Sequence, residues 1–135
     1  MGKKNLKVGI SVGQGRPPGY QWSVWVLNVA FKEAEFLRDE QYEHLVLQFQ
    51  ELARQEDPTH SDVVSVRAIT PEEFHELRDK GGVLGKLNVR VFFGVDKDAR
   101  AIVVLGAIKK ENDGPTPRGD MIRMRSRWRK YHSGE

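Results

Sequence analysis

The sequence predicts a single small α+β domain: a twisted, mainly antiparallel sheet with an N-terminal helix pair and a C-terminal basic helix. A chain of 135 residues is long enough for one hydrophobic core and short for two. Runs rich in β-branched and aromatic residues flank a stretch whose apolar residues recur at helical spacing. The resulting order of strand, helix pair, strands and helix is typical of an α+β domain.

The first twenty residues differ in composition from the rest of the chain. They combine lysines, glycines and the pair Pro17-Pro18, with no acidic residue. We therefore expect residues 1–20 to form a flexible basic arm and residues 21–135 to form the one folded domain.

The next two segments predict a strand followed by two helices. Residues 22–31 are rich in β-branched and aromatic residues, as expected of a buried strand. In residues 32–56 the apolar side chains recur three and four positions apart, which indicates two amphipathic helices. Asp39 is a candidate N-cap for the second helix, and Asp57-Pro58 ends it.

Three further strands and a helix are expected in the second half. Residues 62–69 have the composition of a short strand, and the apolar runs 88–93 and 101–108 are joined by a short polar connection typical of an antiparallel hairpin. Thr116 and Pro117 are suited to cap and start a helix that runs to about Tyr131.

Charge is distributed unevenly along the chain. The net charge is only +3, but residues 1–30, 31–80 and 81–135 carry +4, −7 and +6. The acidic block fits a solvated helical face. The basic C-terminal block is what an anionic partner such as nucleic acid requires.

The last helix concentrates this positive charge. Its apolar residues Met121, Met124, Trp128 and Tyr131 form one stripe, which predicts packing on the sheet. Arginine donors match phosphate oxygens. The candidate RNA-binding residues are the basic residues of this helix together with Lys110 before it: Lys110, Arg118, Arg123, Arg125, Arg127, Arg129 and Lys130. The alternative is that these residues only form a solvated face.

Arg90 lies inside the strand 88–93, on the same face as Phe92. One interpretation is a structural salt bridge from Arg90 to a carboxylate of the acidic helices. The other is an open anion-binding cleft that Arg78 and Lys109 or Lys110 also enter.

Several classes of chemistry and location are disfavoured. The chain has no cysteine, which excludes disulfides, thiolate zinc sites and cysteine nucleophiles. The four histidines have no metal-ligand spacing, so we expect no metal or other cofactor. No run of about 18 apolar residues and no secretory signal is apparent, so we expect a cytoplasmic protein without membrane contact.

Four segments, in this order, resemble one family. They are Glu-Leu-Arg at 76–78, Val-Arg-Val-Phe-Phe at 89–93, Ile-Val-Val-Leu-Gly-Ala-Ile-Lys-Lys at 102–110, and Thr-Pro at 116–117 before the basic helix. The chain resembles the RelE/HigB superfamily of toxins from type II toxin–antitoxin systems, and its phage-derived HigB-like branch in particular. The resemblance spans about residues 22–132, and Val89 and His75 stand where the family has aromatic residues.

The resemblance implies a ribosome-dependent messenger-RNA endoribonuclease whose partners are a cognate antitoxin, the ribosome and messenger RNA. In such enzymes the 2′-hydroxyl attacks the adjacent phosphate while basic side chains stabilise the added charge. Carried over by motif, Arg78 and Arg90 stabilise the phosphate, Lys109 or Lys110 holds the scissile backbone, and Tyr131 or His132 supplies stacking or a proton.

The resemblance also conflicts with one local pattern and leaves other functions open. Thr70-Pro71 followed by acidic residues is a helix-start pattern that makes residues 71–79 helical, whereas the family has a strand there. We favour a strand around residues 74–78 because tertiary pairing often overrides local propensity. The alternative functions are a ParE-like toxin without nuclease activity that acts on DNA gyrase, and a non-catalytic RNA- or ribosome-binding module.

Overall fold

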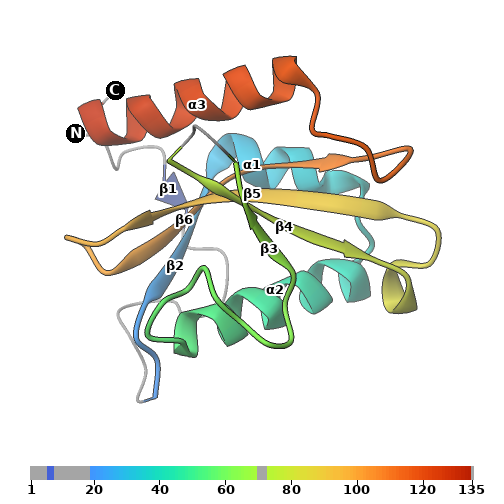
Figure 1. Ribbon diagram of the computed structural model, residues 1–135, viewed down its shortest axis with the longest axis horizontal. Coiled ribbons are helices and arrows are strands. Elements are labelled where there is room, and N and C mark those ends of the chain that lie inside the picture. The colour runs from blue at the N-terminus through green and yellow to red at the C-terminus, as the bar shows by residue number, and fades with distance from the viewer. Residues whose placement is uncertain (1–5, 8–18, 70–72, 135) are drawn as a thin grey trace.

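The structure is a computed structural model that describes residues 6–7, 19–69 and 73–134. In this part of the chain a six-stranded mixed sheet lies between α2 (Asp39–Arg54) on one face and α3 (Arg118–Ser133) on the other (Figure 1). The prediction of an α+β domain with a helix pair and a C-terminal basic helix is confirmed.

The sheet has the strand order β1-β2-β6-β5-β4-β3, and all neighbouring strands are antiparallel except β2 and β6. Because the first long strand pairs in parallel with the last, residues far apart in sequence share the centre of the sheet. The strands are β1 (Leu6–Lys7), β2 (Ser23–Leu27), β3 (Val66–Ala68), β4 (His75–Lys80), β5 (Asn88–Asp96) and β6 (Ala101–Lys109).

The N-terminal part shows where local composition misleads. The strand expected over residues 22–31 ends at Leu27, and α1 (Asn28–Glu33) follows, continued by the 3-10 helix η1 (Ala34–Phe36). Pairing with β6 stops at Val26, so the β-branched and aromatic residues beyond it have no ladder to join. Most of the predicted arm lies outside the described residues, and its Leu6–Lys7 segment pairs with β2 as β1.

The predicted helix pair is present, but the N-cap of its second helix differs from the predicted one. α2 begins at Asp39, and its N-cap is Arg38, whose backbone N–H donates to the Gln41 Oε1 at 2.9 Å. Asp39 is therefore not the cap but a first-turn residue, where its negative charge still favours the helix N-terminus. α2 ends at Arg54, before Asp57-Pro58.

The segment with conflicting predictions is a strand. β4 pairs with β5 over its whole length, from His75 opposite Phe93 to Lys80 opposite Asn88. Residues 70–72, which carry the helix-start pattern, lie outside the described residues. A ladder on both sides of β4 satisfies its backbone groups better than one isolated helical turn could. β3 covers only three residues of the expected strand 62–69, and the short 3-10 helix η2 (Gly82–Leu84) precedes β5.

Side chains of β5 face both helix layers, and the pairing of β5 with β6 shifts register between Phe92 and Phe93. Phe93 packs edge-on against Phe49 of α2, with ring centroids 5.5 Å apart. Gly94 faces α3, where a Cβ would come within 2.5 Å of the Trp128 ring. Gly106 of β6 allows Met124 the same close approach. The stripe predicted for the last helix is confirmed, because Met124, Trp128 and Tyr131 are buried and Met121 is partly buried against the core.

The start of α3 departs from the expected cap. Pro117 occupies the N-cap position, and the helix begins at Arg118. The Thr116 hydroxyl instead donates to the Glu76 Oε2 at 2.7 Å. Thr116 therefore ties the loop before α3 to the sheet.

Candidate nucleic-acid interface

Arg78 and Arg90 lie side by side on the sheet face that carries α3. Arg78 of β4 and Arg90 of β5 are opposite each other in register. Side chains on one face of directly opposed residues have Cβ atoms about 5 Å apart. The motif-based expectation that these two arginines come together agrees with this geometry.

A single buried carboxylate holds the two arginines in place. Glu76 Oε1 accepts from the Arg78 Nε at 2.6 Å, and Glu76 Oε2 accepts from the Thr116 hydroxyl at 2.7 Å. That hydroxyl in turn accepts from Arg90 Nη1 at 2.8 Å. The carboxylate lies between two like charges and offsets their mutual repulsion.

Arg90 is almost entirely buried, with 1% of its surface exposed. Besides Thr116, its guanidinium donates through Nη2 to the Gly114 carbonyl. Burial lowers the pKa of Arg90, while the negative charge of Glu76 opposes this effect. Arg90 therefore anchors the loop before α3, which is neither the expected salt bridge to the acidic helices nor an open cleft.

Arg78 is the solvent-facing member of the pair. A quarter of its side chain is exposed (25%), against 2% for Glu76. Arg67 on β3 pairs in register with Glu76 and is exposed on the same face. No sequence pattern singled out Arg67. A strand there was expected, but only the register between β3 and β4 brings Arg67 next to Arg78.

Lys109, the last residue of β6, and Lys110, which follows it, point to different places. Lys109 lies opposite Val89, on the α2 side of the sheet, and its Nζ is 5.7 Å from the centre of the Phe36 ring. Lys109 is thus separated from Arg78 and Arg90 by the sheet itself. The Lys110 Nζ donates to the Pro115 carbonyl at 3.2 Å, so Lys110 borders the loop that Arg90 anchors.

Tyr131 and His132 lie at the other end of β5. The Tyr131 hydroxyl donates to the Asp96 Oδ2 at 2.6 Å, and Asp96 is six residues along the strand from Arg90, about 20 Å away. Burial, followed by the bond to Asp96, raises the pKa of Tyr131 far above its usual value. The His132 ring contacts the Trp128 ring, with centroids 4.2 Å apart. The structure therefore does not bring Tyr131 or His132 to the two arginines.

One flank of α3 is neutralised by α1. Arg127 forms a two-point ion pair with Glu33, both N–O distances being 2.8 Å, and it also donates to the Leu105 carbonyl. The Arg123 Nε lies 3.4 Å from the same carboxylate. Burial of Glu33 acts to raise its pKa, but the bonds from Arg127 and the Ala107 backbone outweigh this and lower it.

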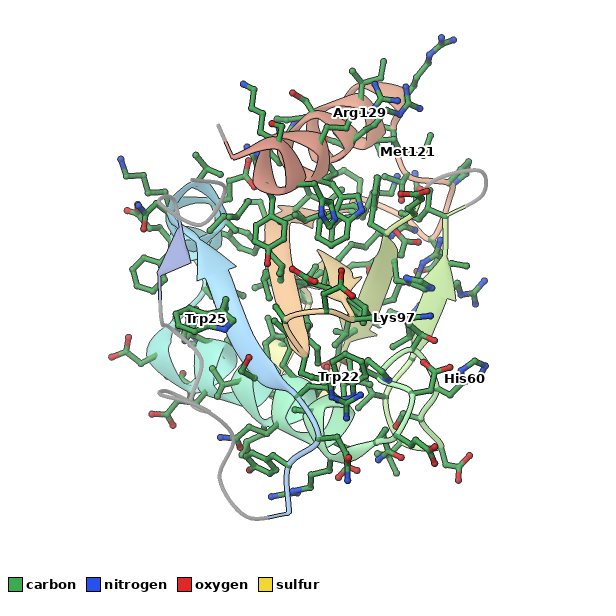
Figure 2. All side chains as sticks on the ribbon, turned by 90° about the vertical axis from the view of Figure 1, so that its left-hand side faces the viewer. Trp22, Trp25, His60, Lys97, Met121 and Arg129 are labelled. Carbon is green, nitrogen blue, oxygen red and sulfur yellow. The ribbon has the colours of Figure 1, made fainter. Side chains whose placement is uncertain are left out.

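The opposite flank of α3 faces the β4–β3 side of the sheet. Helical spacing of three and four residues puts Arg118, Arg125 and Arg129 there, and Arg129 projects on that side in Figure 2. Arg118 and Arg129 are exposed, as is Lys130 on the outer side of the helix. We call the residues Arg67, Arg78, Arg118, Arg125 and Arg129 the arginine surface.

Comparison with protein-family models, with curated proteins and with solved structures found no match to this chain. No helix in the described part of the chain has the length and apolar character needed to cross a membrane. Among the described residues, no group of three or more His, Cys, Asp or Glu side chains is placed to hold a metal ion.

Proposed function

We propose that this protein is a toxin of the RelE/HigB superfamily that cleaves messenger RNA on the ribosome and is neutralised by a cognate antitoxin. The observation that carries the proposal is the in-register pair of Arg78 and Arg90, with Arg78 open to solvent at the edge of the arginine surface. The order of strand, helix pair, antiparallel strands and basic helix also supports membership of the family.

The arginine surface suits a phosphodiester strand. Guanidinium groups donate two parallel hydrogen bonds to a phosphate, and α3 and β3–β4 carry them along one face of the molecule. Such a row tracks a backbone without selecting bases, since phosphate contacts carry no sequence information. The ribosome, which is rich in RNA, is a partner of the same chemistry.

In the proposed cleavage, the RNA 2′-hydroxyl gives its proton to water and attacks the neighbouring phosphorus, and the bond from phosphorus to the 5′-oxygen of the next nucleotide breaks as that oxygen takes a proton from water. The products are a 2′,3′-cyclic phosphate and a 5′-hydroxyl. Arg78 stabilises the extra negative charge on the phosphate oxygens in the transition state. Arg90 and Glu76 act through Arg78 by fixing its position, and Lys110 holds the backbone beside it.

The test combines induced expression with messenger cleavage on purified ribosomes. Induction should arrest growth, and 5′-end mapping should show messenger cut only when ribosomes are present. Removal of a transition-state cation costs about 10²–10³ in rate, so Arg78→Ala should lower cleavage to that extent. The exposed Arg38, which forms a surface ion pair with Glu40, provides the matched control Arg38→Ala, which should cleave normally.

A second variant tests whether Tyr131 takes part in cleavage, as the family resemblance implies. Tyr131→Phe should retain cleavage, because the Tyr131 hydroxyl is bonded to Asp96 about 20 Å from Arg90 along β5. Intact messenger after induction would contradict the nuclease proposal. Double-strand DNA breaks in place of cut messenger would point to a ParE-like poison of DNA gyrase.

The second candidate function is a non-catalytic RNA- or ribosome-binding module. It is favoured by one observation: the described structure does not place Tyr131 or His132 beside Arg78 as a proton donor or acceptor. For this function, Arg78→Ala should weaken RNA binding and reduce its salt dependence, with no cleavage by any variant.

A further inference from the structure

A cleft of about 690 Å³ opens at the end of the sheet where the β5–β6 hairpin turns. It is a different place from the arginine surface, since Arg78 is three residues along β4 from His75 and its side chain lies on the opposite face of the sheet. Figure 2 shows Lys97 and Trp22 near each other at this end of the molecule. The side chains that matter here are Trp22, Glu56, Glu73, His75, Lys97 and Arg100.

Arg100 occupies a backbone conformation that its residue type disfavours. Its φ is +52°, and among the described residues it is the only non-glycine with a positive φ. Hairpin loops usually place Gly or Asn at such a position. Strained non-glycine residues of this kind cluster at functional sites, so the arginine side chain calls for an explanation.

The Arg100 side chain forms a flat platform inside the cleft. Its guanidinium lies over the Trp22 ring, 4.1 Å from the ring centre, and Nη2 donates to the Gln21 Oε1 at 3.3 Å. The Trp22 indole N–H donates to the Gln55 carbonyl at 3.0 Å, which fixes the ring. A guanidinium stacked in this way offers its outer face to a planar ligand, as arginines do to unstacked bases.

His75 contributes an unmatched polar atom to the same wall. Its ring stacks on Phe93, with centroids 5.8 Å apart and 26° between the planes. The Nδ1 atom is buried and has no hydrogen-bond partner among the described residues. Burial lowers the pKa of His75, so the ring is neutral at pH 7. Buried polar atoms are rarely left without a partner.

The charges around the cleft favour a ligand with both an anionic and a hydrogen-donating part. Lys97 and Arg100 are opposed by Glu56 and Glu73, and by Asp57, which accepts from Thr59 and His60. A simple anion would meet three carboxylates and only two cations. A nucleotide whose base carries an amino group matches this pattern, since carboxylates accept from base N–H groups.

We propose that this cleft binds one unstacked purine nucleotide of an RNA strand, with the base on the Arg100–Trp22 stack, its amino group at Glu56 or Glu73, and its phosphate at Lys97. The proposal rests on the RNA-binding part of the proposed function. Asp96, which accepts from Tyr131 of α3, directly precedes Lys97, so the C-terminal part of α3 and the cleft lie at the same end of the sheet. A strand that passes Arg129 and turns around this end of the sheet would reach the cleft.

The experiment measures binding of GMP, AMP and UMP to the full chain by calorimetry and by the Trp fluorescence. GMP and AMP should bind, and UMP, which lacks an amino group and has a smaller ring, should bind at least about fivefold more weakly. Arg100→Gly should weaken GMP binding by about fivefold or more without lowering the melting temperature. Lys86→Gly, on an exposed turn away from the cleft, is the matched control and should bind GMP like the parent.

Lys97→Ala is the second variant, and it should weaken GMP while leaving guanosine unaffected. Undetectable binding of GMP at millimolar concentration, or parental GMP binding by Arg100→Gly, would overturn the proposal. Messenger cleavage without mononucleotide binding would overturn the proposed nucleotide binding in the cleft and leave the nuclease proposal standing. Mononucleotide binding by a protein that cuts no messenger would support the cleft and reject the nuclease.

Discussion

The buried carboxylate of Glu76 is the most informative residue to perturb. It accepts from Arg78 at 2.6 Å and from Thr116 at 2.7 Å, and through Thr116 it reaches Arg90. Glu76→Gln keeps the size and shape of the side chain but removes its charge. Arg78 and Arg90 then lie side by side without a negative charge between them.

The expected loss of stability follows from the burial of the three groups. Breaking a buried ion pair by removing one partner costs about 3–5 kcal/mol. The 25% exposure of the Arg78 side chain allows water to screen part of its charge, so we expect a loss of about 2–4 kcal/mol in the free energy of unfolding.

Urea denaturation at pH 7, followed by Trp fluorescence, measures this loss as a shift in midpoint at constant slope. Glu40→Gln is the matched control, because the Arg38–Glu40 pair is exposed on both sides (69% and 56%), and it should cost at most about 1 kcal/mol. If Glu76→Gln cost no more than Glu40→Gln, the carboxylate would not be holding the two arginines, and the reasoning behind the proposed site would fail.

Three further predictions concern α3 and the hairpin. Bonds from Arg127 and the Ala107 backbone hold the pKa of Glu33 below its usual value in the folded protein. The stability that Glu33 contributes is therefore present at pH 7 and is lost as pH falls through the folded pKa. The difference in urea midpoint between Glu33→Gln and the parent should narrow from pH 7 to pH 3. Gly94→Ala would place a Cβ 2.5 Å from Trp128 and should cost about 1–3 kcal/mol, whereas a parental melting temperature would show that α3 can shift. Arg100→Gly should leave the melting temperature unchanged, because release of about 1–2 kcal/mol of backbone strain offsets loss of the Trp22 contact, worth about 0.5–1 kcal/mol. A large drop in melting temperature would show that Arg100 serves packing.

Local patterns predicted the elements whose residues pack in a regular way. The hairpin of β5 and β6 was evident because two apolar runs flank a short polar connection. The face of α3 that packs on the sheet was evident because four apolar residues recur at helical spacing. In both cases the side-chain period and the burial have the same cause, so the pattern alone was sufficient.

Segments in which tertiary pairing competes with local propensity were harder to predict from the sequence. β-branched residues continue past Leu27, yet the chain turns into α1 because the pairing of β2 with β6 ends at Val26. Thr116 has the sequence context of a cap, yet its hydroxyl binds Glu76, which is distant in sequence. Propensity acts over a few residues, whereas a strand partner or a buried carboxylate acts through space.

For the candidate site, the sequence by itself determined the supply of charge: a basic last third, an arginine within a strand and an arginine-rich helix. Only the tertiary structure decided how those charges are used. The register of β4 with β5 joins Arg78 to Arg90, the sheet separates Lys109 from both, and Glu33 neutralises one flank of α3. The physical reason is that attraction and screening depend on distance and burial, and the order of residues along the chain specifies neither until the strands are paired.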